Sequence, residues 1–133
     1  MSVTLDTNVY VSALNFGGRA ARLLAMAEKG AIVIDISDHI ENELIRVLRE
    51  DFQWEGYRLH FMMERLRKIT RHVIPSVPVK VVDDPDDDRI IACALAAGST
   101  HVLTNDKALL RIGQYAGISI VKPDEFFTLS NER

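Results

Sequence analysis

The stretch "DDPDDDRIIACALAAGSTHVLTND", residues 83–106, decides the fold. Asp84 followed by Pro85 is typical of a helix N-cap with proline at the first helical position. Apolar residues then follow at helical spacing until Gly98, a common helix terminator, and the short apolar run 101–104 has the character of a strand. A helix leading directly into a buried strand predicts one unit of an alternating α/β fold.

The same alternation extends in both directions. Strands are predicted at 3–5, 31–36, 72–82 (interrupted by Pro75 and Pro78), 101–104 and 118–121, and helical patterns occupy most of the chain between them and after Pro123. Such alternation with short connections favours parallel strands with helices on both faces. We therefore expect a three-layer α/β/α sandwich with a central five-stranded parallel sheet, formed by one domain over residues 1–133.

Composition restricts the class of protein. The chain has 133 residues, 47% hydrophobic and 26% charged, which is ordinary for one globular domain. A single cysteine, Cys93, excludes an internal disulfide and fits a cytoplasmic location. No apolar run approaches the roughly 20 residues that span a bilayer, and the N-terminus does not resemble a signal peptide.

The formal net charge of −3 excludes nucleic-acid binding through overall charge. One local basic segment, residues 58–72, has five arginine or lysine residues and a single glutamate, Glu64. It fits either a solvated helix face or an RNA-binding patch. The candidate RNA-binding residues are Arg58, Arg65, Lys68 and Arg71.

Acidic residues follow two of the predicted strands. Asp6 comes directly after the first strand and Asp106 follows the fourth, and each is preceded or followed by threonine and asparagine. Ligands in parallel sheets bind beyond the carboxyl ends of the strands. Both aspartates are therefore candidates for one site, although either residue alone fits a turn or a helix cap. The neighbouring supporting candidates are Thr7, Asn8, Thr104 and Asn105.

The acidic run at 83–88 divides into two parts. Helix capping and the helix dipole account for Asp84, Asp86 and Asp87. Asp88 shares a helical face with Ile91 and Leu95, so we expect it to pack against the sheet. A buried carboxylate needs a partner, and a metal ion would serve.

A fourth acid is expected from "SDHIENELIRVL", residues 37–48, which begins with a serine cap. Helical periodicity does not separate Glu41 from Glu43 as the acid near the site. Converging carboxylates favour Mg²⁺ or Mn²⁺. A calcium EF-hand is disfavoured because its glycine and distal glutamate are missing, and zinc because the histidines lack ligand spacing.

Four segments in order resemble the PIN-domain family, and the resemblance covers nearly the whole chain. They are LDTNVYVSAL (5–14), SDHIENELIRVL (37–48), DPDDDRIIACALAAGSTHVLTND (84–106) and KALLRIGQYAGISIVKPDEF (107–126). The chain is most similar to toxin components of prokaryotic toxin–antitoxin pairs. The resemblance selects Glu43 over Glu41.

The resemblance implies a metal-dependent endoribonuclease with Mg²⁺ or Mn²⁺ held by Asp6, Glu43, Asp88 and Asp106, which would also be its catalytic residues. It further implies an RNA substrate, a cognate antitoxin and a homodimer. The aromatic and methionine-rich segment 52–63 fits either core packing or a partner contact.

Two other classes remain as alternatives. A non-catalytic PIN-like module would act only through a partner. A phosphoreceiver domain would share the sheet and the acidic pocket, but it needs two adjacent acids after the first strand, where this chain has Asp6 alone.

Overall fold

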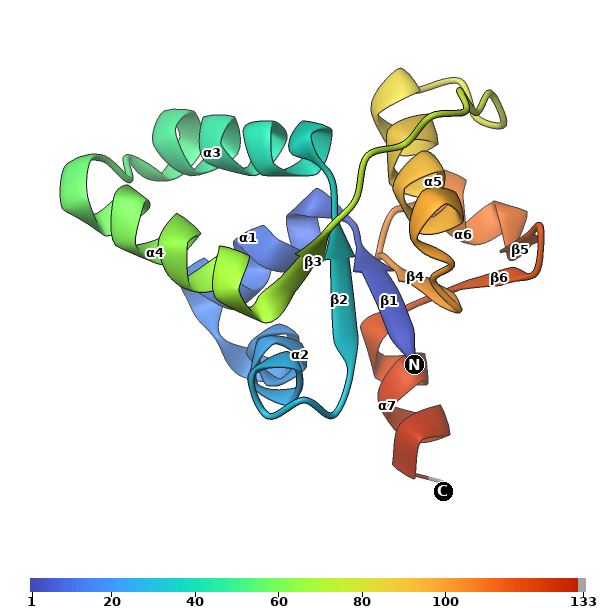
Figure 1. Cartoon of the computed structure of the whole chain (residues 1–133), viewed down its shortest axis with the longest axis horizontal. Helices are drawn as coiled ribbons and strands as arrows, with labels where there is room; N and C mark the ends of the chain where they lie inside the picture. Colours follow the sequence, from blue (N-terminus) through green and yellow to red (C-terminus); the bar gives the residue numbers. More distant parts are fainter. Residues whose placement is uncertain (132–133) are drawn as a thin grey trace.

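The computed structural model describes residues 1–131 and has a six-stranded sheet at its centre (Figure 1). The strand order is β3-β2-β1-β4-β6-β5. Five strands are mutually parallel, and β5 pairs antiparallel with β6. The strands are β1 (Ser2–Leu5), β2 (Val33–Ile36), β3 (Thr70–His72), β4 (His101–Leu103), β5 (Gln114–Tyr115) and β6 (Ile118–Val121).

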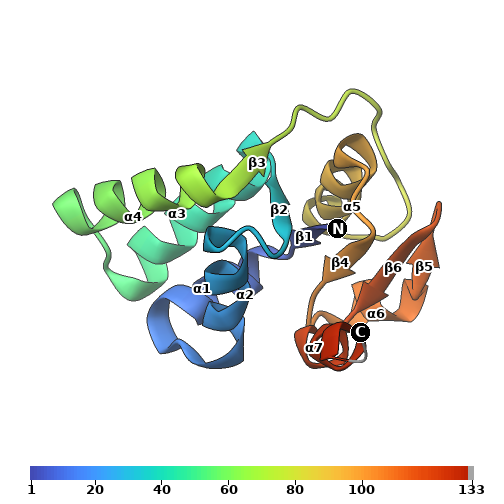
Figure 2. The same ribbon diagram turned by 60° about the horizontal axis from the view of Figure 1, so that its bottom comes forward.

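Helices cover both faces of this sheet (Figure 2). They are α1 (Thr7–Phe16), α2 (Gly18–Glu28), α3 (Asp38–Phe52), α4 (Gly56–Ile69), α5 (Pro85–Ala97), α6 (Lys107–Ile112) and α7 (Pro123–Asn131). Helix α5 lies across β1, β2 and β4, and it also contacts α3. The predicted α/β class, with helices on both sides of a mostly parallel sheet, is confirmed.

Two details of the predicted sheet are wrong. The sheet has a sixth strand, β5, because residues 114–121 form a short antiparallel hairpin with Ala116 and Gly117 at positive φ (50° and 83°). The third strand covers residues 70–72 instead of 72–82. Pro75 and Pro78 have no N–H to donate to a neighbouring strand, so the chain leaves the sheet after His72.

The start of α5 follows the sequence pattern. Asp84 is the N-cap, its side chain accepts a 2.9 Å hydrogen bond from the Asp86 amide, and Pro85 occupies the first helical position. Gly98 ends the helix in the left-handed conformation at φ 70°. The buried side of the helix includes Ile91 and Cys93, so Cys93 is a core residue, as its position in an apolar helix predicts.

The hydrophobic core fills the space between the sheet and its helices. Strand side chains such as Val3, Ile34 and Val102 are completely buried, as expected for parallel strands covered on both faces. Among residues 1–131, no helix is both long and apolar enough to cross a membrane. The carboxyl ends of β1 and β4 therefore lie beside each other, and the predicted site acids Asp6 and Asp106 come shortly after these two ends.

Candidate metal site

A cavity of about 220 Å³ opens beyond the carboxyl ends of β1 and β4. Six carboxylates line it, together with a single cationic side chain, Arg46. The acids are Asp6, Glu43, Asp84, Asp86, Asp87 and Asp106. Arg46 itself is exposed and pairs with Glu50 at 3.2 Å, so it offsets little of this negative charge.

Asp6 and Asp106 meet because β1 and β4 are parallel neighbours with Leu5 opposite Leu103. The Asp6 amide continues this pairing with a 3.0 Å hydrogen bond to the Leu103 carbonyl. The completely buried hydroxyl of Thr104 joins the two acids: it donates to Asp6 Oδ2 at 2.7 Å and accepts from the Asp106 amide at 2.9 Å. Asp6 and Asp106, which the sequence predicts to share one site, therefore lie together in the structure.

The pKa of Asp6 is raised by burial and, to a lesser extent, by repulsion from Asp106. Hydrogen bonds from Thr104 and from backbone amides act in the opposite direction. Asp106 is also the N-cap of α6, since its Oδ1 accepts from the Leu109 amide at 3.1 Å. The turn role and the pocket role that were alternatives for Asp106 thus coexist in one residue.

Glu43 enters the cavity from α3, and the Thr7 hydroxyl donates a hydrogen bond to its Oε1. Burial and the neighbouring Asp86 raise the pKa of Glu43. Glu41, the other candidate, is nearly buried away from the cavity, where it forms an ion pair with Arg67 at 3.2 Å. The structure thus places Glu43, and not Glu41, with the other acids.

Asp87 lines the cavity in the place expected for Asp88. Burial, and to a lesser extent repulsion from the carboxylates of Asp106, Asp84, Asp6 and Asp86, together raise the pKa of Asp87 to about 7. A carboxyl that retains a proton near neutral pH shows how strongly this pocket disfavours additional negative charge.

Asp88 lies outside the cavity, contrary to the expectation that it faces the other acids. Its Oδ1 accepts hydrogen bonds from the backbone amides of Val81 and Val82, at 2.8 and 3.0 Å. The residue is 7% exposed, so it is buried as predicted. The preceding loop, which folds back over the first turn of α5, supplies both of these amides.

The four supporting candidates differ in their placement. Thr7 and Thr104 are buried and hydrogen bonded to site acids, and Asn8 is exposed at the cavity. Asn105 is exposed and is not among the residues that line the cavity. Sequence proximity to an acid therefore identifies a site residue only where the backbone turns it inward.

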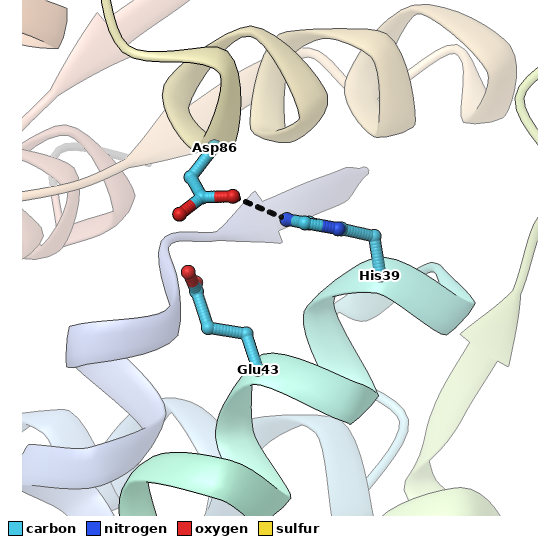
Figure 3. A group of neighbouring side chains, drawn as sticks. All are labelled: His39, Glu43 and Asp86. Carbon is cyan, nitrogen blue, oxygen red and sulfur yellow. Dashed lines mark ion pairs between the residues drawn. The ribbon is translucent and has the colours of Figure 1, made fainter.

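His39 adds a ring nitrogen that could coordinate a metal ion, and the sequence did not predict this residue as part of the site. His39, Glu43 and Asp86 each offer one ligand atom, and these atoms lie within 4.8 Å of one another (Figure 3). His39 and Glu43 are four residues apart on α3, so they share a face of that helix. That spacing was visible in the sequence, but only α5 brings Asp86 to the same point.

The four candidate RNA-binding residues lie in different surroundings. Arg71 pairs at 2.8 Å with Asp35, whose side chain is completely buried, and donates to the Ala97 carbonyl at 2.9 Å. Arg58 lies over the Trp54 ring at 3.7 Å. Arg65 and Lys68 are exposed on α4, beside a groove shared with α2. Arg71 is thus engaged within the fold, in contrast to Arg65 and Lys68.

The chemistry of the pocket suits a hard divalent cation. Carboxylate oxygens are the ligands that Mg²⁺ and Mn²⁺ prefer, and burial with repulsion between neighbouring acids raises the pKa values of Asp6, Glu43 and Asp87. Hydrogen bonds from Thr7 and Thr104 hold two of these carboxylates in fixed orientations. The residues present therefore fit a bound metal ion.

Comparison with known proteins agrees with this arrangement. Residues 2–108 match a family described as PIN domain. The fold resembles the toxin chain in a crystal structure of VapBC2 from Rickettsia felis bound to a DNA fragment from its promoter, with a TM-score of 0.59 and 16% sequence identity. The match covers 90% of this chain and 97% of the other. No curated protein matches the sequence.

Proposed function

We propose that this chain, which belongs to the PIN-domain family, is a divalent-metal-dependent endoribonuclease and the toxin of a toxin–antitoxin pair. The observation that carries the proposal is the gathering of six carboxylates in one cavity at the ends of β1 and β4. Hydrolysis of a phosphodiester requires positive charge near the reacting phosphate, and such a cavity can supply it only through bound cations.

In this proposal Asp6, Glu43, Asp87 and Asp106 hold Mg²⁺ or Mn²⁺. A bound ion would lower the pKa of a water molecule and offset charge that develops on phosphate oxygens. Asp87 replaces Asp88 in the set because Asp87 lines the cavity, whereas both amides that Asp88 binds belong to the loop.

The threonines position these carboxylates. Thr104 donates to one oxygen of Asp6 and so fixes the orientation of that carboxylate toward a ligand. Thr7 does the same for Glu43. We assign a contact with a phosphate group of the substrate to Asn8, which is exposed at the cavity edge.

We assign RNA contacts to Arg58, Arg65 and Lys68 on α4, which are exposed and outside the acidic cavity. Arg71 is removed from this group, because its guanidinium neutralises the buried Asp35. The proposal places the enzyme in the cytoplasm, where it would meet RNA and an antitoxin.

The 52–63 segment contributes to both the core and the surface. Trp54 and Met63 are buried, whereas Tyr57 and Phe61 are 80% and 62% exposed and stack on each other with centroids 5.9 Å apart. We assign this exposed pair to a contact between two copies of the chain. Replacing both rings by serine is expected to weaken self-association in analytical ultracentrifugation, and an unchanged sedimentation profile would reject the assignment.

The function is tested by incubating purified protein with RNA and Mg²⁺ or Mn²⁺, with chelator as the metal-free control. Wild type is expected to cleave internal phosphodiester bonds, and Asp6→Asn to lose this activity while keeping its fold by circular dichroism. A surface variant, Asp51→Asn, serves as the matched control because Asp51 is exposed on α3. Equal cleavage by all three proteins would exclude the proposed site.

A further inference from the structure

The histidine beside the acidic cavity has a geometry that carboxylate chemistry alone does not explain. His39 is the second residue of α3, and its ring points toward Asp86 at the start of α5 (Figure 3). Nε2 lies 3.1 Å from Asp86 Oδ1. This nitrogen is shielded from solvent, and despite that short distance it makes no hydrogen bond of good geometry with the described residues.

The other ring nitrogen is held from the opposite side. Nη1 of Arg89 lies 2.7 Å from His39 Nδ1. Arginine can only donate, so Nδ1 accepts and the proton of the neutral ring is on Nε2. The ring therefore directs an N–H group toward Asp86 in a shielded space beside Glu43, close enough for an ion pair but without a hydrogen bond of good geometry.

A cation in that space would satisfy all three side chains. Divalent ions bind nitrogen and oxygen donors at about 2.0–2.2 Å, so donors around one ion are separated by up to about 4.4 Å. The ligand atoms of His39, Glu43 and Asp86 already lie within 4.8 Å of one another. Small side-chain rotations are enough to close the remaining difference.

We propose that His39, Glu43 and Asp86 form a second cation site, with one nitrogen and two oxygen ligands, which shares Glu43 and Asp86 with the lining of the carboxylate cavity. This inference rests on the proposed metal-dependent function and extends it to a residue outside the acidic set. An imidazole ligand favours a first-row transition ion such as Mn²⁺ over Mg²⁺. The site therefore makes the protein selective among divalent ions.

Arg89 opposes occupation of this site. An ion at Nε2 requires the tautomer with the proton on Nδ1, and that tautomer cannot accept from Arg89. The guanidinium must then move away, which is feasible because Arg89 is exposed. Its positive charge also repels the ion, so removing it should tighten Mn²⁺ binding by up to about tenfold, the value for a unit charge and a divalent ion some 6 Å apart in water.

The direct test is pulsed electron paramagnetic resonance of Mn²⁺ bound to the full chain, without RNA. Electron spin echo envelope modulation detects a directly coordinated nitrogen. Protein labelled with ¹⁵N in the histidine rings alone separates an imidazole from backbone nitrogen, because only the imidazole then changes isotope. We expect histidine coupling in wild type and in His60→Gln, a matched control on α4 with an exposed histidine. His39→Gln is expected to lose the coupling but still bind Mn²⁺ at the carboxylates.

Arg89→Gln is expected to keep the coupling and to lower the dissociation constant for Mn²⁺ by up to about tenfold, with a smaller change for Mg²⁺. Absence of histidine coupling in Mn²⁺-loaded wild type overturns the second site, even if His39→Gln does not fold. If such protein still cleaves RNA, the proposed function stands and only this inference fails. Coupling without cleavage in wild type would support the site and reject the nuclease.

Discussion

The hydroxyl of Thr104 donates a 2.7 Å hydrogen bond to Asp6 Oδ2 and thereby connects the ends of two adjacent parallel strands. The hydroxyl oxygen of Thr104 also accepts a hydrogen bond from the Asp106 amide, so one completely buried side chain holds both strand-end acids. The candidate site is thus built by the sheet itself, and its geometry depends on the Thr104 hydroxyl as well as on the acids.

Replacing Thr104 by valine should damage the site without changing side-chain volume much. Asp6 loses its donor and the Asp106 amide loses its acceptor, at a cost of about 1–3 kcal/mol in the free energy of unfolding. Chemical denaturation measures the loss, and Mn²⁺ titration should show weaker binding. Thr100→Val is the control, because the Thr100 hydroxyl is exposed. Equal destabilisation by both changes would contradict the connecting role of Thr104.

Asp87 makes the stability of the metal-free protein depend on pH. Its pKa is 3.8 in the reference state and about 7 in the folded protein, so the folded state retains a proton that the unfolded state has released between these values. The unfolding free energy should therefore fall as pH rises from about 4 to 7, and then level off. Thermal unfolding at several pH values, with chelator present, measures this trend.

Asp87→Asn should remove most of that pH dependence and make the metal-free protein more stable than wild type at pH 8. Excess Mn²⁺ should have a similar effect on wild type, because a bound cation stabilises the ionised carboxylates. A wild-type slope that Asp87→Asn leaves unchanged would assign the titration to another group.

Asp88 should contribute to folding stability but not to metal binding. Asp88→Ala removes the acceptor of the Val81 and Val82 amides, so we expect a loss of about 1–3 kcal/mol in unfolding free energy. Metal affinity should change little, because the side chain lies outside the cavity. Calorimetric titration with Mn²⁺ tests the second expectation, and a large loss of affinity in a folded variant would return Asp88 to the site.

Substitutions of the basic residues should distinguish Arg71, which stabilises the fold, from Arg65 and Lys68, which we propose bind RNA. Arg71→Gln leaves the buried carboxylate of Asp35 without its charged partner but with the Ser99 hydroxyl as a donor, so we expect a loss of about 1–3 kcal/mol in unfolding free energy. Arg65→Gln and Lys68→Gln should each change stability by under about 0.5 kcal/mol but reduce the salt dependence of RNA binding. If the two surface changes leave RNA binding unchanged at every salt concentration, the RNA path lies elsewhere.

The sequence predicted best what depends on neighbours along the chain. The caps at Ser37 and Asp84 and the terminator at Gly98 are local features, and each occurs as expected. Asp6 and Asp106 also met as predicted, because the carboxyl ends of parallel strands share one edge of the sheet.

The remaining features depend on contacts that no local pattern contains. Adjacent residues of a helix point about 100° apart, so an error of one residue in assigning the buried face exchanges Asp87 for Asp88. The amides that bind Asp88 belong to a loop whose path is set by packing. Arg71 and Asp35 are 36 residues apart and meet only because β2 and β3 pair.

The most direct test of the account compares RNA cleavage by two neighbouring variants, Asp87→Asn and Asp88→Asn, in Mn²⁺ and at equal concentrations of folded protein. Both changes remove one charge from the first turn of α5, so they differ only in where the side chain points. We predict that Asp87→Asn lowers the cleavage rate by about 100-fold or more, while Asp88→Asn stays within about tenfold of wild type. Loss of activity in Asp88→Asn together with full activity in Asp87→Asn would contradict the site described.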